Sequence, residues 1–231
     1  MAEHWNLDDL TRRSLKGLAR FQLALALMIF LPAWSLTYWR GLAYWIMFGV
    51  ACFGLTLYFV RNDPKLVERR MNAGPTAESE PTQKIILWCA SAALIATYIA
   101  SALDHRFGWS AVSIGTSLLG DALVLIGFYG IFVTLKENSF AAATVRAESE
   151  QRVISSGPYA LMRHPMYTSA LIMFVGTPLA LGSWWGLLPA LLLAATIVWR
   201  LLDEEKFLAR NLPGYADYQR SVPARLVPGV W

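Results

Sequence analysis

Long apolar stretches separated by short polar segments dominate this chain. Four of them lie at about residues 18–39, 41–60, 84–103 and 111–135. Each is close to the roughly 20 residues that a helix needs to cross the hydrocarbon core of a bilayer. A fifth block, 166–202, is too long for one straight crossing and is interrupted at Thr177-Pro178 and again around Gly182. The pattern predicts an all-α transmembrane bundle whose last block is a helical hairpin with its tip near residues 178–186.

The polar segments predict how this bundle is oriented. Residues 1–17 mix charges with apolar positions at near-helical spacing, which predicts a short amphipathic helix on the membrane surface. Lys and Arg residues alternate along the segments outside the spans as four, one, five, one and four, and five more follow from Arg200 onward. By the positive-inside rule this alternation places both termini in the cytoplasm. We expect five to six passes, in the inner membrane if the source is bacterial.

Composition supports this class and excludes others. Of the 231 residues 56% are hydrophobic and 16% charged, whereas soluble domains average about 25% charged residues. A disordered chain, a collagen-like chain and a small disulfide scaffold are excluded. The net charge of +4 belongs to the basic cytoplasmic segments, so the expected partner is the lipid bilayer and not nucleic acid. The three histidines and two cysteines have no paired-ligand spacing, so no metal site is expected.

Polar residues concentrate in the C-terminal half. We expect one integrated domain, with residues 1–110 supplying the interfacial helix and anchor spans and residues 111–231 forming the half that carries the candidate chemistry. The stretch Ala73–Pro81 is interpreted as a connector.

The densest polar cluster is 151–167. Gly157-Pro158 predicts a turn, and Pro165 suits the first position of the following helix, with His164 near the N-cap. Such a helix N-terminus can receive a carboxylate or phosphate. The alternative is an interfacial loop with snorkelling arginines and interfacial tyrosines.

A second cluster, Trp199–Glu205, closes the hairpin. Arg200 and Glu204 are spaced i, i+4 and share a helix face. Three consecutive acids at a cytoplasmic helix end are unfavourable unless one of them binds something, such as a ribose diol or an ammonium group. The alternative is a solvated helix end anchored by Arg200. Because the hairpin returns to the side it left, both clusters should face each other across its base.

These residues resemble a known signature. Arg163-His164-Pro165-Met166-Tyr167, a hairpin-length apolar gap and Glu204-Glu205 are similar to the RHPxY…EE pattern of the isoprenylcysteine carboxyl methyltransferase family and the related phospholipid methyltransferases. Gly157-Pro158-Tyr159, Leu212–Tyr215 and Arg225–Gly229 strengthen the resemblance. It covers residues 136–231 closely and the anchor only in hydropathy.

The resemblance implies methyl transfer from S-adenosyl-L-methionine, with S-adenosyl-L-homocysteine as product. It implies cofactor contacts from Gln151, Val153, Ile154, Tyr159, Arg163, His164, Pro165, Met166, Tyr167, Glu204 and Glu205. It places Arg200 on the substrate side, where it can engage a carboxylate, and His164 can act as a base for an acceptor that must lose a proton. The acceptor is a carboxylate, thiol or amine of a small or lipophilic molecule, with a prenylcysteine carboxylate most similar.

Two other functions stay open at this point. One is an NADPH-dependent membrane reductase of the sterol and steroid reductase group, and the other is a non-enzymatic membrane scaffold or transporter. No GxGxxG occurs, so a soluble Rossmann-type methyltransferase is unsupported. Asp121 lies inside the fourth span, and Asn138 follows it and matches a family asparagine. Asp121 can equally pair with a neighbouring helix and Asn138 can simply end one, so both stay outside the main site.

Overall fold

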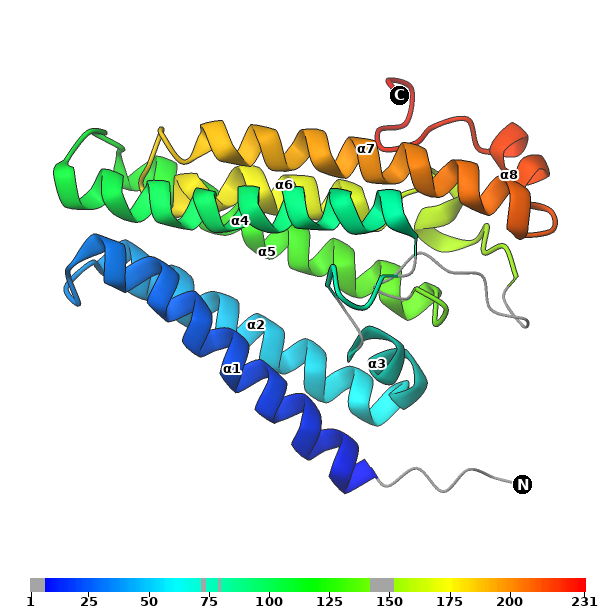
Figure 1. Cartoon of the computed structure of the whole chain (residues 1–231), viewed down its shortest axis with the longest axis horizontal. Coiled ribbons are helices and arrows are strands. Elements are labelled where there is room, and N and C mark those ends of the chain that lie inside the picture. The colour runs from blue at the N-terminus through cyan, green and yellow to red at the C-terminus, as the bar shows by residue number, and fades with distance from the viewer. Residues whose placement is uncertain (1–6, 72–73, 79, 142–151) are drawn as a thin grey trace.

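The computed structural model describes residues 7–71, 74–78, 80–141 and 152–231 (Figure 1). In these ranges every regular element is a helix and there is no strand. The α-helices are α1 (Leu7–Ala33), α2 (Trp39–Asn62), α3 (Pro64–Met71), α4 (Pro81–Phe107), α5 (Ile114–Glu137), α6 (Pro165–Ala180), α7 (Leu187–Asn211) and α8 (Tyr215–Ser221), with a 3-10 turn, η1, at Gly157–Ala160. The predicted all-α class is confirmed.

The predicted spans correspond to long apolar helices. The helices α1, α2, α4 and α5 are each long and apolar enough to cross a membrane, and α6 is a shorter apolar helix. The helices α6 and α7, joined at residues 181–186, form the predicted hairpin. Large apolar side chains such as Leu23, Leu36 and Leu192 lie exposed on the outer faces, as lipid-facing side chains do. The chain is therefore a multi-pass membrane protein.

Two features near the N-terminus differ from the prediction. The described part of the expected interfacial segment, from Leu7, continues without a break into the first span, so α1 is one helix. Its first turns do not lie alone on a surface: Leu10 and Ser14 are buried, and the Ser14 hydroxyl lies 3.9 Å from the sulfur of Met71 in α3. The helix α3 lies in the basic segment between the second and third spans and was not predicted. The start of α1 therefore packs against α3.

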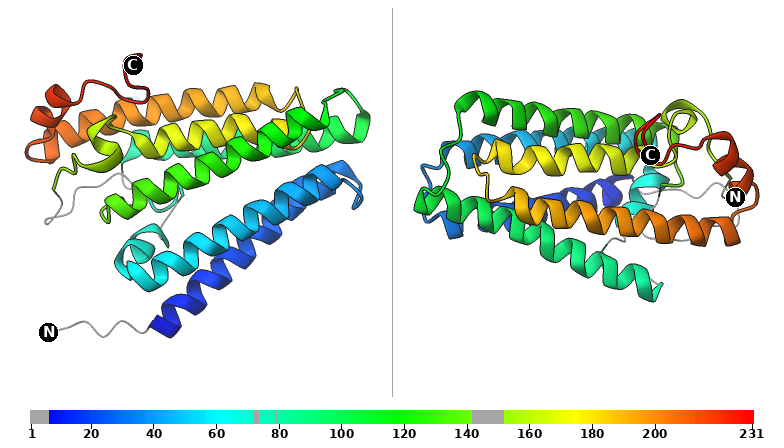
Figure 2. Two further views of the ribbon diagram at one scale, coloured as in Figure 1. Left: turned by 180° about the vertical axis from the view of Figure 1, so that it is seen from behind. Right: turned by 90° about the horizontal axis from the view of Figure 1, so that it is seen from above.

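The helices α4 to α7 pack side by side in a row, and the pair α1 and α2 packs against this row. Seen from above, α5, α6, α7 and α4 follow one another, and each packs on the next (Figure 2). The helices α1 and α2 pack together on one side of this row, where α1 contacts α4 (Figure 1). The helix α3 packs against both of them. The hairpin base, α8 and the C-terminal segment gather at the end of the row opposite the hairpin tip.

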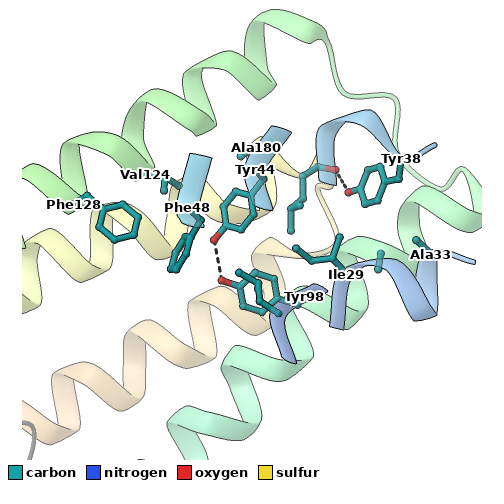
Figure 3. Packing of buried hydrophobic residues seen from close by; sticks show 12 residues of the cluster. Ile29, Ala33, Tyr38, Tyr44, Phe48, Tyr98, Val124, Phe128 and Ala180 are labelled. Carbon is teal, nitrogen blue, oxygen red and sulfur yellow. Dashed lines mark hydrogen bonds between the residues drawn. The ribbon is translucent and has the colours of Figure 1, made fainter. Parts of the chain in front are cut away.

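Aromatic side chains join the pair to the row (Figure 3). The Tyr44 and Tyr98 hydroxyls lie 2.8 Å apart and link α2 to α4, while the Tyr38 hydroxyl donates to the carbonyl of Leu181 at the hairpin tip. Phe48 of α2 packs edge-on against Phe128 of α5. The shared core contains Leu25, Ile29, Ala33, Tyr38, Tyr44, Phe48, Tyr98, Ala102, Val124, Phe128, Ala180 and Leu181. This core reaches the hairpin tip through Ala180 and Leu181.

The backbones of α5 and α6 approach each other through glycines. A Cβ atom added to Gly120 would lie 2.2 Å from the backbone nitrogen of Ala180, and one added to Gly176 would lie 2.8 Å from the carbonyl oxygen of Gly120. A Cβ atom on Gly130 would lie 2.2 Å from the hydroxyl oxygen of Ser169. Small residues allow such close packing between membrane helices. The contact fixes the first turn of α6 beside the end of α5, where the site begins.

We expect Gly120→Ala to destabilise the protein by about 1–3 kcal/mol, the typical cost of overpacking, because the new methyl group meets backbone that cannot rotate away. Gly54→Ala is the matched control, since nothing lies within 4 Å of an added Cβ atom there. Thermal unfolding in detergent, followed by circular dichroism, measures both. Equal midpoints for the two variants would contradict the close approach of α5 and α6.

Candidate active site

A cavity of about 350 Å³ lies at the base of the hairpin. Its walls come from α3, the end of α5, η1, the first turn of α6, α7 and α8, and they join a polar edge to an apolar floor. They include Arg70, Asn138, Val153, Ile154, Tyr159, Arg163, His164, Pro165, Met166, Tyr167, Ile197, Arg200, Glu204, Leu208, Leu212, Tyr215 and Tyr218. The two sequence clusters thus meet, as predicted.

The first turn of α6 is built as its sequence predicts. His164 is the N-cap residue, and Pro165 occupies the first turn, where its missing N–H costs nothing. The backbone N–H groups of Arg163 and His164 donate to the carbonyls of Ala224 and Arg225, each at 3.0 Å. These bonds attach the C-terminal segment to the residues that precede the helix.

Glu205 binds two arginines and a histidine at this junction. One carboxylate oxygen accepts from Arg163 Nε at 2.6 Å and lies 3.2 Å from His164 Nε2, and the other accepts from Arg225 Nε at 3.0 Å. Burial alone would raise the pKa of Glu205, but hydrogen bonds from His164, Arg163 and Arg225 outweigh it and lower the pKa to about 2. Glu205 is not among the residues that line the cavity. Its predicted cofactor contact stays a prediction, and the geometry gives it a supporting position.

Glu204 points the other way, into the cavity wall. The Tyr167 hydroxyl donates to its carboxylate and accepts from Arg200 Nε at 2.9 Å. Tyr167 and Arg200 are both buried, and the ring of Tyr167 stacks beside that of His164, with centroids 5.5 Å apart. A carboxylate and a guanidinium are thereby held on either side of one phenol. The predicted shared face of Arg200 and Glu204 is confirmed.

On the opposite wall η1 positions Tyr159. The Tyr159 hydroxyl accepts from Asn138 Nδ2 at 3.1 Å, and its carbonyl accepts from the Tyr218 hydroxyl at 2.7 Å. Gly157 begins η1 with a φ of +56°, in the left-handed region that favours glycine. Burial raises the pKa of Tyr159 to about 12, so its phenol stays protonated. Asn138 ends α5 and also lines the cavity, which joins its two predicted roles.

Most of the predicted site residues come together in this cavity. Of the predicted set, Gln151 lies outside the described residues, and Glu205 lies behind the wall. Asp121 lies on α5, far along the helix from Asn138 at its end, and one of its carboxylate oxygens is buried without a hydrogen-bond partner in the described part of the chain.

Three residues near the site were not predicted. Arg70 of α3 lines the cavity. Glu78, buried in the expected connector, lies 3.9 Å from Arg200, and Gln83 of α4 donates to the carbonyl of Arg200 at 3.3 Å and to Asp203 at 2.7 Å. Arg70 is one of several basic residues in its segment, and nothing in the sequence separates it from its neighbours. For Gln83 the sequence gave only a weak indication of a role near the site, namely an amide side chain at the start of an apolar span.

Comparison with known proteins identifies a family that part of the chain resembles. The phospholipid methyltransferase family matches from Thr116, near the start of α5, to Pro213, just after α7. The match covers residues 116–213, so this segment of the chain is similar to phospholipid methyltransferases. The segment includes η1, α6 and α7, so it carries Tyr167, Arg200 and Glu204. The resemblance to membrane methyltransferases is thereby confirmed, and neither the reductase nor the non-enzymatic interpretation gains support.

Two curated proteins are similar to this chain. The nickel-cobalt-cadmium resistance protein NccN of Alcaligenes xylosoxydans xylosoxydans is 28% identical over 108 residues, covering 45% of this chain and 49% of that protein. The cobalt-zinc-cadmium resistance protein CzcN of Cupriavidus metallidurans is 30% identical over 107 residues, covering 44% and 48%. The chain thus spans about half the length of the curated relatives it matches. Among the described residues no group of three His, Cys, Asp or Glu side chains is placed to hold a metal ion.

We expect Glu205→Gln to destabilise the protein by about 3–5 kcal/mol, because it leaves the buried Arg163 guanidinium without its counter-charge. The native pKa of about 2 lies below the ordinary 4.5, so the stabilisation is fully present above about pH 4.5 and is lost as pH falls toward 2. Unfolding midpoints of wild type and variant should therefore differ by a constant amount from pH 8 to 5 and converge in acid.

Asp217→Asn is the control for this variant, since it breaks an ion pair with Arg220 in which both side chains are exposed. Such surface pairs contribute about 0–1 kcal/mol. A Glu205→Gln variant that unfolds at the same midpoint as Asp217→Asn at neutral pH would disprove the structural role of the cluster.

Proposed function

We propose that this chain is an integral membrane methyltransferase that uses S-adenosyl-L-methionine. In this proposal it transfers the methyl group to a carboxylate, thiol or amine of a small or lipophilic acceptor. One observation carries the proposal. Tyr167 holds the Glu204 carboxylate and the Arg200 guanidinium side by side at a cavity formed largely by the family segment. One charge suits the cofactor and the other suits an anionic acceptor.

The side chains present fit this cofactor. The Glu204 carboxylate can accept from ribose hydroxyls or from an ammonium group. The first-turn N–H groups of Met166 and Tyr167 have no partner within α6, and the positive end of the helix favours a carboxylate. Tyr159 and Leu212 supply an aromatic and an apolar surface for a purine. The cavity volume of about 350 Å³ falls within the usual range of about 300–1,000 Å³ for ligand sites.

The proposed chemistry asks little acid–base help of the protein. When bound, S-adenosyl-L-methionine supplies an electrophilic methyl group on a sulfonium. The chain's own contribution is to align the acceptor and exclude water. Arg200, held by Tyr167, orients an acceptor carboxylate, which is already nucleophilic.

A thiol or amine acceptor must first lose a proton. The Nε2 atom of His164 lies 3.2 Å from Glu205, which leaves Nδ1 as the atom that can accept that proton. His164 is therefore the candidate base for those two acceptor classes, and it is not needed for a carboxylate.

Binding of S-adenosyl-L-homocysteine by purified protein tests the cofactor assignment. We expect His164→Ala and Glu204→Gln each to weaken binding about tenfold, the effect of losing a charge-assisted hydrogen bond or the packing behind it. Asp203→Asn is the matched control. Asp203 is the carboxylate immediately before Glu204 on α7, but it accepts a hydrogen bond from Gln83 and does not line the cavity. Isothermal titration calorimetry measures all three. Tight binding of a nicotinamide dinucleotide without any S-adenosyl-L-homocysteine binding would favour the reductase instead.

Transfer of a labelled methyl group to prenylcysteine analogues, small thiols and amino lipids tests the acceptor. If Arg200 holds a carboxylate, Arg200→Lys should lower kcat/KM about tenfold for carboxylate acceptors, because an ammonium cannot form the paired hydrogen bonds of a guanidinium. Transfer to a neutral amine should change much less. An equal loss for all acceptors would show that Arg200 supports the fold or the cofactor and does not select the acceptor.

A further inference from the structure

A second hollow lies against the back of the active-site cavity. It has a volume of about 430 Å³ and is formed by α1, α2, α3 and the last turns of α5. Its lining is mainly apolar, with Leu18, Phe21, Leu55, Phe59 and Leu135 among its members. Only α5 among these elements belongs to the segment matched by the family. We call this hollow the α1–α3 groove.

The groove and the cavity have two lining residues in common. Arg70 of α3 and Ile131 of α5 line both of them. The helix α3 is held in place by Leu66, which packs with Phe59 and Leu135. The two hollows are therefore neighbours that meet at the side chains of Arg70 and Ile131.

Arg70 brings to this junction a charge that has no counter-ion among the described residues. One guanidinium nitrogen, Nη1, donates to the carbonyl of Ala141 at 3.1 Å and lies 3.6 Å from the sulfur of Met166. In the described part of the chain no carboxylate lies within ion-pair distance of Arg70. Burial lowers the pKa of Arg70, which reflects poor solvation of its charge. An anion at this point would therefore be bound strongly.

The other cation of the groove is already neutralised. Arg13 pairs with Asp9 at 2.8 Å and lies 3.8 Å from Glu68. No acidic side chain lines the groove within the described residues. An occupant that complements the groove thus has an apolar chain and one anionic group, with the anion at Arg70 and next to the cavity.

We propose that the α1–α3 groove receives the hydrocarbon chain of the methyl acceptor and that Arg70 selects acceptors with an anionic group beside that chain. This inference rests on the proposed methyltransferase function and adds the part of the site that recognises the acceptor. It assigns a specificity-determining role to a residue outside the matched family segment. The groove recognises the hydrocarbon chain and Arg70, between the groove and the cavity, recognises the anion. The acceptor's reactive end therefore lies in the cavity.

A photoreactive probe tests the groove directly. The probe is a medium-chain fatty acid with a diazirine on its chain, added to wild-type protein in phosphatidylcholine nanodiscs and mapped by mass spectrometry. We expect labelling of α1 and α2 residues of the groove. We expect Arg70→Gln to lower it about tenfold, the effect of losing a charge-assisted contact, and Arg70→Lys to restore part of it. Lys65→Gln is the matched control, because Lys65 is an exposed cation on the same helix that lines neither hollow.

A second pair of variants tests the chain without touching the charge. Gly17 lines the groove, and nothing lies within 4 Å of a Cβ atom added there, so Gly17→Leu fills space without a clash. We expect it to lower labelling by the fatty acid severalfold. Gly54→Leu is the control, since it is equally unobstructed but outside the groove lining.

Three results would overturn this inference. The first is labelling that Arg70→Gln does not change, and the second is equal labelling by the matching alkyl trimethylammonium probe. The third is displacement of the fatty-acid probe by phosphatidylglycerol more readily than by unlabelled fatty acid, because this would identify the groove as a membrane-lipid site. Binding of S-adenosyl-L-homocysteine is measured on the same preparations. Its absence would refute the proposed function, whereas its presence with any of these three results would refute the acceptor groove alone.

Discussion

The buried carboxylate of Glu205 is the interaction on which the site depends. It joins three separate parts of the chain, because Arg163 and His164 precede α6, Glu205 belongs to α7 and Arg225 belongs to the C-terminal segment. A buried charge is costly unless it is paired and hydrogen-bonded, and here both oxygens have cationic partners. The cluster therefore closes the hairpin base, and it adds ion pairs to the apolar packing of Leu201 with Leu226 there.

The position of Glu205 also determines that of Glu204. Successive residues on an α-helix point about 100° apart, so when one carboxylate faces the C-terminal segment its neighbour turns toward Tyr167 and the cavity. Two consecutive acids thus serve two purposes, one holding the fold and one available to a ligand. This division explains why the acids at this helix end are tolerated. It also means that substitution of Glu205 should change stability, whereas substitution of Glu204 should change ligand binding.

The sequence was informative where a physical rule connects residues that are close along the chain. Apolar length predicted the spans and the hairpin, and the Pro165 and Arg200–Glu204 spacings predicted the first turn of α6 and the shared face on α7. It was uninformative about contacts made between elements. The burial of Glu78 and Gln83 beside Arg200, and the position of Arg70 between two hollows, depend on how α3 and α4 pack. In sequence, Arg70 is one cation in a basic segment, and positive-inside counting treats all such cations alike.

The contacts of Arg200 and Arg70 show that the site draws on both sides of the predicted boundary at about residue 110. Hydropathy separates an anchor from a polar C-terminal half, and the family match also lies wholly in the second half. Yet the guanidinium of Arg200 lies between Tyr167 from the second half and Glu78 from the first, and Arg70 from the first half closes the back of the cavity. A membrane enzyme with a lipophilic acceptor needs a wall that faces lipid as well as a pocket that faces water. In this chain the first half can supply that wall, because α1, α2 and α3 form most of an apolar groove. This groove adjoins the cavity at Arg70 and Ile131.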